Sequence, residues 1–285
     1  MRDDARGRPP RGVDVHGYIV GRDQPVAAQR VARIGEREQR ARARRLLESG
    51  EGFRSPWPRA NAFAVLGAVA LLAAAPARPA AAHALLGAAA AGLGSVSRDR
   101  GRPWPEPRLA YANGVLADAR IAAGAELADD GLLEEGLRLL EWLVEVETRG
   151  EHFSFTPVGG WAPGEPRPGF DQQPIEVAAM ADACARAFDA TGDPIWADRV
   201  QLAAAWFLGR NDVGVPLLDA RTGGCKDGLE RDGVNENEGA ESTIALIGAL
   251  QQVRRVQAAA RRASISVEAS TSAAPTQRSA APYVR

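Results

Sequence analysis

The sequence predicts an all-α fold built from helical hairpins, and three observations lead to this expectation. Apolar residues recur at helical spacing, as Leu133, Leu137, Leu140 and Val144 do. Breaks rich in proline and glycine separate the helical stretches. No stretch alternates apolar and polar residues over several positions, and only the short run 213–218 is compatible with a small strand or turn.

Composition bounds the class of protein. The chain has 285 residues, which suffices for one large domain or two small ones. Its formal net charge is -1, so no bulk electrostatic field favours nucleic acid or an acidic membrane as a partner. Cys184 and Cys225 lie far apart and lack metal-ligand spacing, so we expect no metal and no cofactor. The free thiols and the absence of an apolar leader indicate a cytoplasmic protein.

The N-terminal segment, residues 1–58, is predicted to be irregular or helical and is rich in arginine. Residues 1–24 show no periodicity, whereas residues 25–48 have sparse apolar positions that are compatible with a helix. An Arg-rich helix can contact anions or nucleic acid, but a solvated helix face is the commoner explanation. No aromatic residues interleave with the arginines, so we expect no nucleic-acid partner.

A helical domain is predicted over residues 59–260. Its helices are expected at 59–75, 80–93, 109–123, 130–148, 174–190, from Pro194 through Phe207, and at 238–260. Gly124 and Gly150 are expected to end two of them. Gly192, Asp193 and Pro194 suit a left-handed C-cap, an N-cap and a first-turn proline.

Two further stretches complete the organisation of the chain. The apolar run 62–75 is shorter than the roughly 20 residues of a membrane-spanning helix, so we expect a buried helix and no membrane span. Residues 261–285 are rich in Ser, Thr, Ala and Pro, and are predicted to be a disordered tail. Lys226 is the only lysine of the chain and is interpreted as an exposed loop cation.

Polar, turn-rich segments precede the helices expected near residues 109, 174 and 238, and in a ring of hairpins they would line one face. They hold amides, carboxylates and aromatic residues, a mixture that suits a saccharide. Planar polar groups bind vicinal hydroxyls, aromatic faces cover sugar C–H groups, and paired acids support glycoside hydrolysis. The predicted catalytic residues are Asp171, Glu176, Asp227 and Glu241. The predicted substrate-binding residues are Tyr111, Asn113, His152, Trp161, Gln172, Gln173, Asn211, Asn235, Glu236 and Asn237.

Each of these residues also has a simpler explanation. Asp171 and Glu176 suit the start of a helix, where carboxylates are stabilised by the helix dipole. Asn235 or Asn237 suits an N-cap of the last helix. His152 is a lone histidine and is compatible with a purely structural role.

Several segments together resemble a known family. They are LAYAN at 109–113, HFSF at 152–155, FDQQPIE at 170–176, WFLGRND at 206–212, and the run 223–243. They are similar to the α/α-toroid, six-hairpin glycosidase-like module that follows group-1 glycosyltransferase domains in bacteria, and the likeness covers roughly residues 59–256. The resemblance implies a partial or complete toroid, a saccharide ligand and a role in carbohydrate metabolism.

The chain departs from that family in two ways. It shows no α/β alternation and no phosphate-cradling glycine loop, so a glycosyltransferase domain is expected only on another chain. Its sequence also predicts fewer helices than a complete toroid needs.

Three functions are therefore open at this point. The first is a carbohydrate-active enzyme of glycosidase or epimerase type. The second is a non-catalytic module that binds sugar or serves a glycosyltransferase as a scaffold. The third is a helical protein-interaction domain that uses its Arg-rich N-terminal segment.

Overall fold

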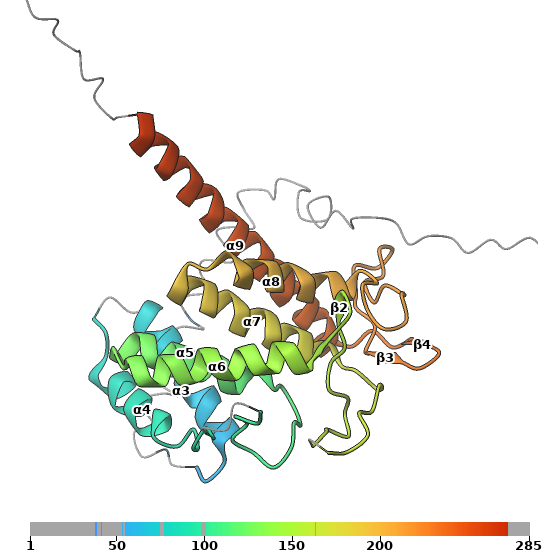
Figure 1. Cartoon of the computed structure of the whole chain (residues 1–285), viewed down its shortest axis with the longest axis horizontal. Coiled ribbons are helices and arrows are strands. Elements are labelled where there is room, and N and C mark those ends of the chain that lie inside the picture. The colour runs from blue at the N-terminus through green and yellow to red at the C-terminus, as the bar shows by residue number, and fades with distance from the viewer. Residues whose placement is uncertain are drawn as a thin grey trace, which may run out of the picture.

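The computed structural model describes residues 38, 41, 53, 55–74, 77–97, 101–162 and 164–272, with side chains described as far as residue 262. These residues form seven helices and two short hairpins (Figure 1). The helices are α3 (Pro58–Ala74), α4 (Ala80–Ala90), α5 (Gly114–Leu127), α6 (Asp130–Val146), α7 (Pro174–Thr191), α8 (Pro194–Phe207) and α9 (Ala240–Ser272). The mostly helical fold is confirmed, while most of the helix expected at 25–48 lies outside the described residues.

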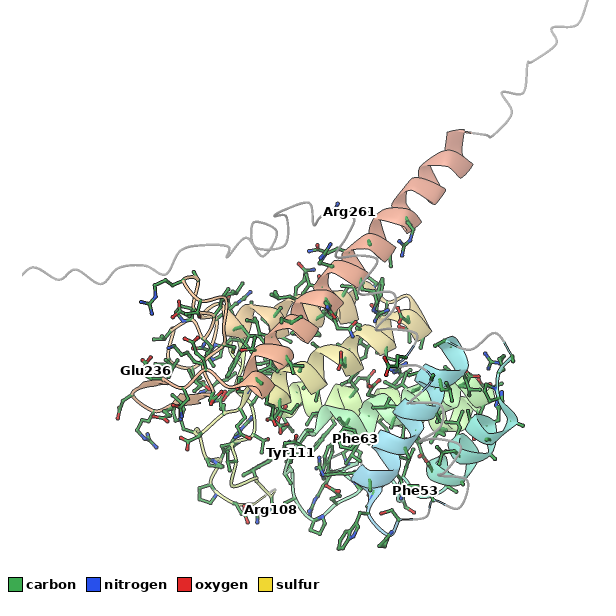
Figure 2. The ribbon with its side chains drawn as sticks, turned by 180° about the vertical axis from the view of Figure 1, so that it is seen from behind. Phe53, Phe63, Arg108, Tyr111, Glu236 and Arg261 are labelled. Atoms are coloured by element: carbon green, nitrogen blue, oxygen red, sulfur yellow. The ribbon has the colours of Figure 1, made fainter. Side chains whose placement is uncertain are left out.

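The helices form two layers. In the first, which we call the row, α3, α5, α7 and α9 lie side by side, and each packs on the next. In the second, α4, α6 and α8 each pack on the two row helices that flank them in sequence. Seen from behind in Figure 2, α3 and α9 lie toward the viewer and form the two ends of the row.

The four row helices begin at the same end of the molecule. Arg59, in the first turn of α3, bonds to Asn113 just before α5. Asn113 in turn bonds to Glu176 in the first turn of α7. The backbone of Gln172, just before α7, pairs with Leu229, in the segment between α8 and α9. The polar segments that the sequence singled out therefore do gather at one end of the row.

Tight turns join the hairpins α5–α6 and α7–α8. Ala128 ends α5 in the left-handed region at a φ of 54°, and the Asp129 side chain accepts a hydrogen bond from the backbone of Leu132. Gly192 ends α7 at a φ of 71°, and Asp193 caps α8 directly before Pro194. The predicted cap at residues 192–194 is confirmed.

Gly124 does not end a helix, contrary to the expectation. It lies inside α5, where a Cβ atom would come within 2.5 Å of the backbone nitrogen of Leu133 on α6. The missing side chain is needed for close packing between the two helices, and the helix continues to Leu127. The expected start at residue 109 is also wrong, because Leu109 pairs with Trp161 through two backbone hydrogen bonds.

Two hairpins were not predicted. Strand β1 (Thr148–Arg149) pairs with β2 (His152–Phe153), and β3 (Gly228–Glu230) pairs with β4 (Gly233–Asn235). Both are too short to show alternation in the sequence. In the run 213–218, Leu218 forms an isolated bridge with Cys225.

Helix α9 runs to Ser272 and therefore passes the expected end at residue 260. No proline or glycine interrupts the sequence between Gly248 and Pro275, so nothing stops the helix at 260. Residues 261–272, which were expected to belong to the tail, continue α9, and residues 273–285 lie outside the described part. Within the described residues, no helix combines the length and the apolar character needed to cross a membrane.

We predict that Gly124→Ala lowers the free energy of unfolding by about 1–3 kcal/mol, because the methyl group has to displace the α6 backbone. Gly248→Ala on α9 is the matched control, since no heavy atom of the described residues lies within 4 Å of the position that its Cβ would take. Alanine should raise the stability there by up to about 1 kcal/mol through helix propensity. Urea unfolding measures both, and equal effects of the two substitutions would contradict the packing role of Gly124.

Candidate functional site

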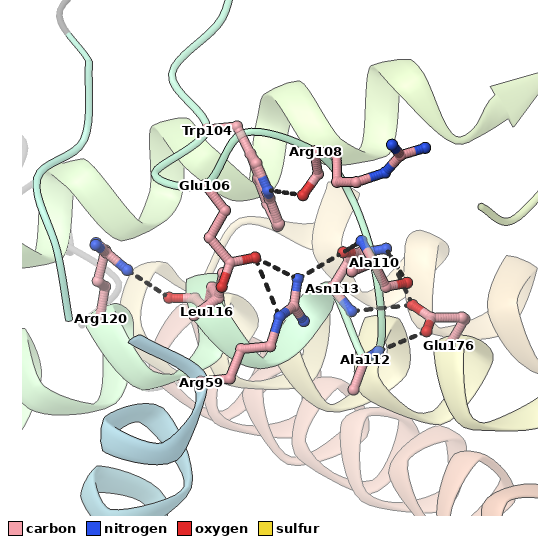
Figure 3. Close-up of polar contacts among 10 residues, drawn as sticks. All are labelled: Arg59, Trp104, Glu106, Arg108, Ala110, Ala112, Asn113, Leu116, Arg120 and Glu176. Carbon is pink, nitrogen blue, oxygen red and sulfur yellow. Dashed lines mark hydrogen bonds and ion pairs between the residues drawn. The ribbon is translucent and has the colours of Figure 1, made fainter. Parts of the chain in front are cut away.

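Glu176 joins the starts of α5 and α7. Its Oε1 accepts a hydrogen bond from the backbone nitrogen of Ala112 at 2.5 Å, and its Oε2 accepts one from that of Asn113 at 2.9 Å (Figure 3). The residue is 4% exposed. Burial and the charge of Glu147 raise the pKa of Glu176 to about 8, against the opposite effect of these bonds. Glu176 therefore supports the loop ahead of α5, and in this conformation a ligand does not reach it.

Asn113 extends this network to α3. Its Oδ1 accepts hydrogen bonds from the backbone of Ala110 at 2.9 Å and from Nη2 of Arg59 at 3.0 Å (Figure 3). Arg59 is also paired with Glu106 at 2.7 Å. Asn113 is fully buried, so it positions the loop instead of offering its amide to a ligand.

Tyr111 lies on the loop that this network holds in place. It lies one residue before Ala112 and is 46% exposed. Partial burial, followed by the charges of Glu241 and Glu176, raises the pKa of Tyr111. Glu241 is exposed in the first turn of α9, and its charge acts on the Tyr111 hydroxyl from a separate segment of the chain.

Gln172 is a buried centre of hydrogen bonds. Its Oε1 accepts from the backbone of Phe155 at 3.1 Å and from Nε1 of Trp206 at 3.2 Å. Its Nε2 donates to the carbonyl of Gly169 at 2.7 Å and to Asp212 at 2.5 Å. The side chain of Gln172 thus makes all four of its possible hydrogen bonds within the protein, which makes Gln172 a structural residue.

The side chains of His152 and Asn211 also interact with groups of the protein itself. Nε2 of His152 lies 3.0 Å from Asp212. Burial would raise the pKa of Asp212, but hydrogen bonds from Ser154, His152 and Gln172 together lower it. Asn211 is buried, and its amide bonds to the backbone at Trp206 and Val215.

The polar groups of the acidic loop before α9 bond mainly to one another and to the start of that helix. Asp227 accepts hydrogen bonds from the backbone of Gly239 at 2.7 Å and from the Ser242 hydroxyl at 2.6 Å, and so caps α9. Lys226 pairs with Glu236 at 2.9 Å and with Glu238 at 3.0 Å. The interpretation of Lys226 as an exposed loop cation was wrong, since its side chain is only 16% exposed.

Asn235 and Asn237 belong to the same loop. The Asn235 side chain accepts a hydrogen bond from the Asn237 backbone at 3.1 Å and donates to Glu230 at 3.3 Å. The Asn237 carbonyl accepts a bond from the Asp227 backbone at 2.9 Å. These bonds shape the turn between β4 and α9.

Trp161, Asp171 and Gln173 lie on the long loop before α7. Nε1 of Trp161 donates to the Glu165 carbonyl at 3.0 Å, and the Arg167 guanidinium lies 5.9 Å from the centre of its ring. The Asp171 side chain is exposed, and its carbonyl accepts a hydrogen bond from the backbone of Val158 at 3.0 Å. Gln173 takes the N-cap position of α7 without a capping side-chain bond.

A polar cluster that the sequence reasoning missed lies further along the row. It occupies a depression of about 450 Å³ lined by Leu66, Asp118, Asp182, Arg186, Asp189, Gln252 and Arg255. These residues come from α3, α5, α7 and α9 alone. The signal in the sequence was the pair Asp182 and Arg186, four residues apart in an alanine-rich helix, which resembles an ordinary surface ion pair.

We call this side of the row, away from α4, α6 and α8, the open face. Its half that lies near the helix starts exposes Phe63 on α3 and Tyr111, and Ile244 and Ile247 are exposed on α9. Figure 2 shows Phe63 and Tyr111 on this side. The other half holds the charged depression. Two further hollows, of about 500 and 490 Å³, lie beside α8 and α6 and contain none of the predicted site residues.

No group of three or more potential ligands among the described residues is placed to hold a metal ion. Burial raises the pKa of the Cys184 thiol, and it raises the pKa of Cys225 to about 12, which opposes formation of a nucleophilic thiolate.

No protein-family model matches the sequence, and no curated protein matches it either.

The supporting role of Glu176 can be tested by substitution. Glu176→Gln keeps the size of the side chain but replaces one of two engaged acceptor oxygens with a donor, so we expect a loss of about 1–3 kcal/mol in the free energy of unfolding. Glu241→Gln makes the same change at an exposed position and should stay within about 0.5 kcal/mol of wild type. Urea unfolding of both variants measures these changes. If Glu176→Gln is as stable as wild type, Glu176 does not support the loop ahead of α5.

Proposed function

We propose that this chain is a carbohydrate-binding module of the α/α-toroid, six-hairpin glycosidase-like type, and that it binds a saccharide on the open face at Tyr111. The observation that carries the proposal is the half-exposed ring of Tyr111, held near the exposed carboxylate of Glu241 by the buried Glu176 network. An aromatic face and a carboxylate together suit the C–H face and the hydroxyls of a sugar.

The arrangement of helices supports a partial toroid. The row helices start at one end, and the second layer packs on one side only, as expected of consecutive hairpins within a ring. The resemblance of residues 109–113, 170–176 and 223–243 to the toroid family agrees with this placement. It also suggests a glycosyltransferase on another chain as a partner.

We favour binding over turnover because two of the four acids considered for catalysis are engaged within the protein. Glu176 is buried under the loop ahead of α5, and Asp227 holds the start of α9. Asp171 and Glu241 are exposed. Glycoside hydrolysis needs two carboxyl groups about 5–10 Å apart on one bond, so a hydrolytic activity would have to use these two.

A glycan screen followed by calorimetric titration of the best ligand tests this proposal. We expect Tyr111→Ala to weaken binding at least about tenfold, which corresponds to about 1.4 kcal/mol, and Tyr111→Phe to retain most of the affinity because the ring stays. Ile195→Ala is the control, because Ile195 is 47% exposed on α8, in the other layer.

Equal affinities of wild type and Tyr111→Ala, or a glycan screen without any ligand, would refute the proposal. Sugar release that Asp171→Asn or Glu241→Gln abolishes while binding persists would instead identify an enzyme.

A further inference from the structure

We propose that the depression in the open face is a second binding site, specific for a hydroxylated organic cation of the amino-sugar class. It lies at Asp118, about one helical turn past the start of α5, and does not use Tyr111. The inference goes beyond the proposed function and does not depend on it.

The shape of the depression suits a small ligand. Its volume of about 450 Å³ falls in the range of small-molecule sites. Four separate helices contribute to its wall, with Leu66 of α3 as the apolar part and polar residues of α5, α7 and α9 as the rest. A site that is built on helices holds its groups in place better than one on loops.

Hydrogen bonds within the depression fix the polar groups before any ligand binds. Nε of Arg186 donates to Oδ1 of Asp118. Nε2 of Gln252 donates to Oδ1 of Asp182 at 2.6 Å. Within the described part of the chain, these bonds engage one oxygen of each aspartate, so the second oxygen of each is available as an acceptor.

Arg255 completes the arrangement. Its Nε donates to Oε1 of Gln252 at 2.8 Å, and its Nη1 pairs with Asp189. Gln252 is thereby held with its amide nitrogen toward Asp182. The two arginines bond to Asp118 and Asp189, and the bond that the described residues give the Asp182 carboxylate comes from an uncharged amide.

The charge of the depression favours a cation. Three carboxylates face two guanidinium groups, and the Asp118 side chain is only 5% exposed. Burial raises the pKa of Asp118 to about 6 even though Arg186 acts in the opposite direction, and Asp182 and Arg255 contribute further charges. Burial also raises the pKa of Asp182, although the hydrogen bond from Gln252 and the charges of Arg186 and Arg255 lower it. The carboxylates outnumber the guanidinium groups by one, so a ligand ammonium group would supply the matching charge, while hydroxyl groups bond to the remaining acceptors.

Calorimetric titration of the full chain with glucosamine, glucose and glucuronate tests the inference. At pH 7 we expect glucosamine to bind at least about tenfold more tightly than glucose, and glucuronate to bind more weakly than either. Affinity for glucosamine should fall between pH 7 and pH 5, because Asp118 becomes protonated as the pH drops through about 6. Equal binding of the three sugars would overturn the inference.

Asp182→Asn should weaken glucosamine binding at least about tenfold, because it removes the negative charge while its oxygen still accepts the bond from Gln252. Asp198→Asn is the matched control on the exposed surface of α8 and should bind like wild type. If Asp182→Asn does not fold, as judged by circular dichroism, Asp189→Asn at the more exposed rim replaces it, with a smaller loss expected.

The two sites can be told apart with Tyr111→Ala. We expect this variant to retain glucosamine binding at the depression. If Tyr111→Ala abolishes glucosamine binding while Asp182→Asn preserves it, the amino sugar occupies the Tyr111 site, and the second site is refuted while the proposed function stands.

Discussion

The buried carboxylate of Glu176 is the constraint on which the open face depends. It reaches from the first turn of α7 to the backbone of Ala112 and Asn113, just ahead of α5. Burying a carboxyl group costs free energy unless hydrogen bonds satisfy it, and here both oxygens accept a hydrogen bond from a backbone N–H group. Because Asn113 then holds Arg59 of α3, one acid connects three of the four row helices.

This connection explains why the open face has two different halves. Near the helix starts the network engages the buried polar groups, and the exposed side chains include Phe63, Tyr111 and Ile244 together with the carboxylate of Glu241. Further along the row, α5, α7 and α9 exchange hydrogen bonds through Asp118, Arg186 and Gln252 instead. The second layer covers only the other side of the row, so both halves remain in contact with solvent.

The sequence predicted what local chemistry decides. The cap at residues 192–194 follows from backbone preferences of Gly, Asp and Pro, and the apolar stripe of α6 from helical periodicity. Contacts distant in sequence decided the rest. Leu109 pairs with Trp161 and therefore does not begin a helix. Gly124 lacks a side chain, which allows Leu133 to pack closely against it.

The candidate site was predicted less well than the fold, for a related reason. An amide that binds a ligand and an amide that holds a loop look alike in sequence, and Gln172, Asn113 and Asn211 proved to hold loops. The charged depression was missed because Asp182 and Arg186 have the spacing of a surface ion pair. Only the packing of α9 against α7 reveals that Asp182 bonds to Gln252 and that both line one hollow with Arg186.

Hydrogen–deuterium exchange with and without a bound saccharide tests most directly whether the open face is the functional surface. The structure predicts added protection in the starts of α5 and α9, around residues 111–118 and 240–255, with α6 and α8 unchanged. Protection that is confined to α6 and α8, on the other side of the row, would contradict it.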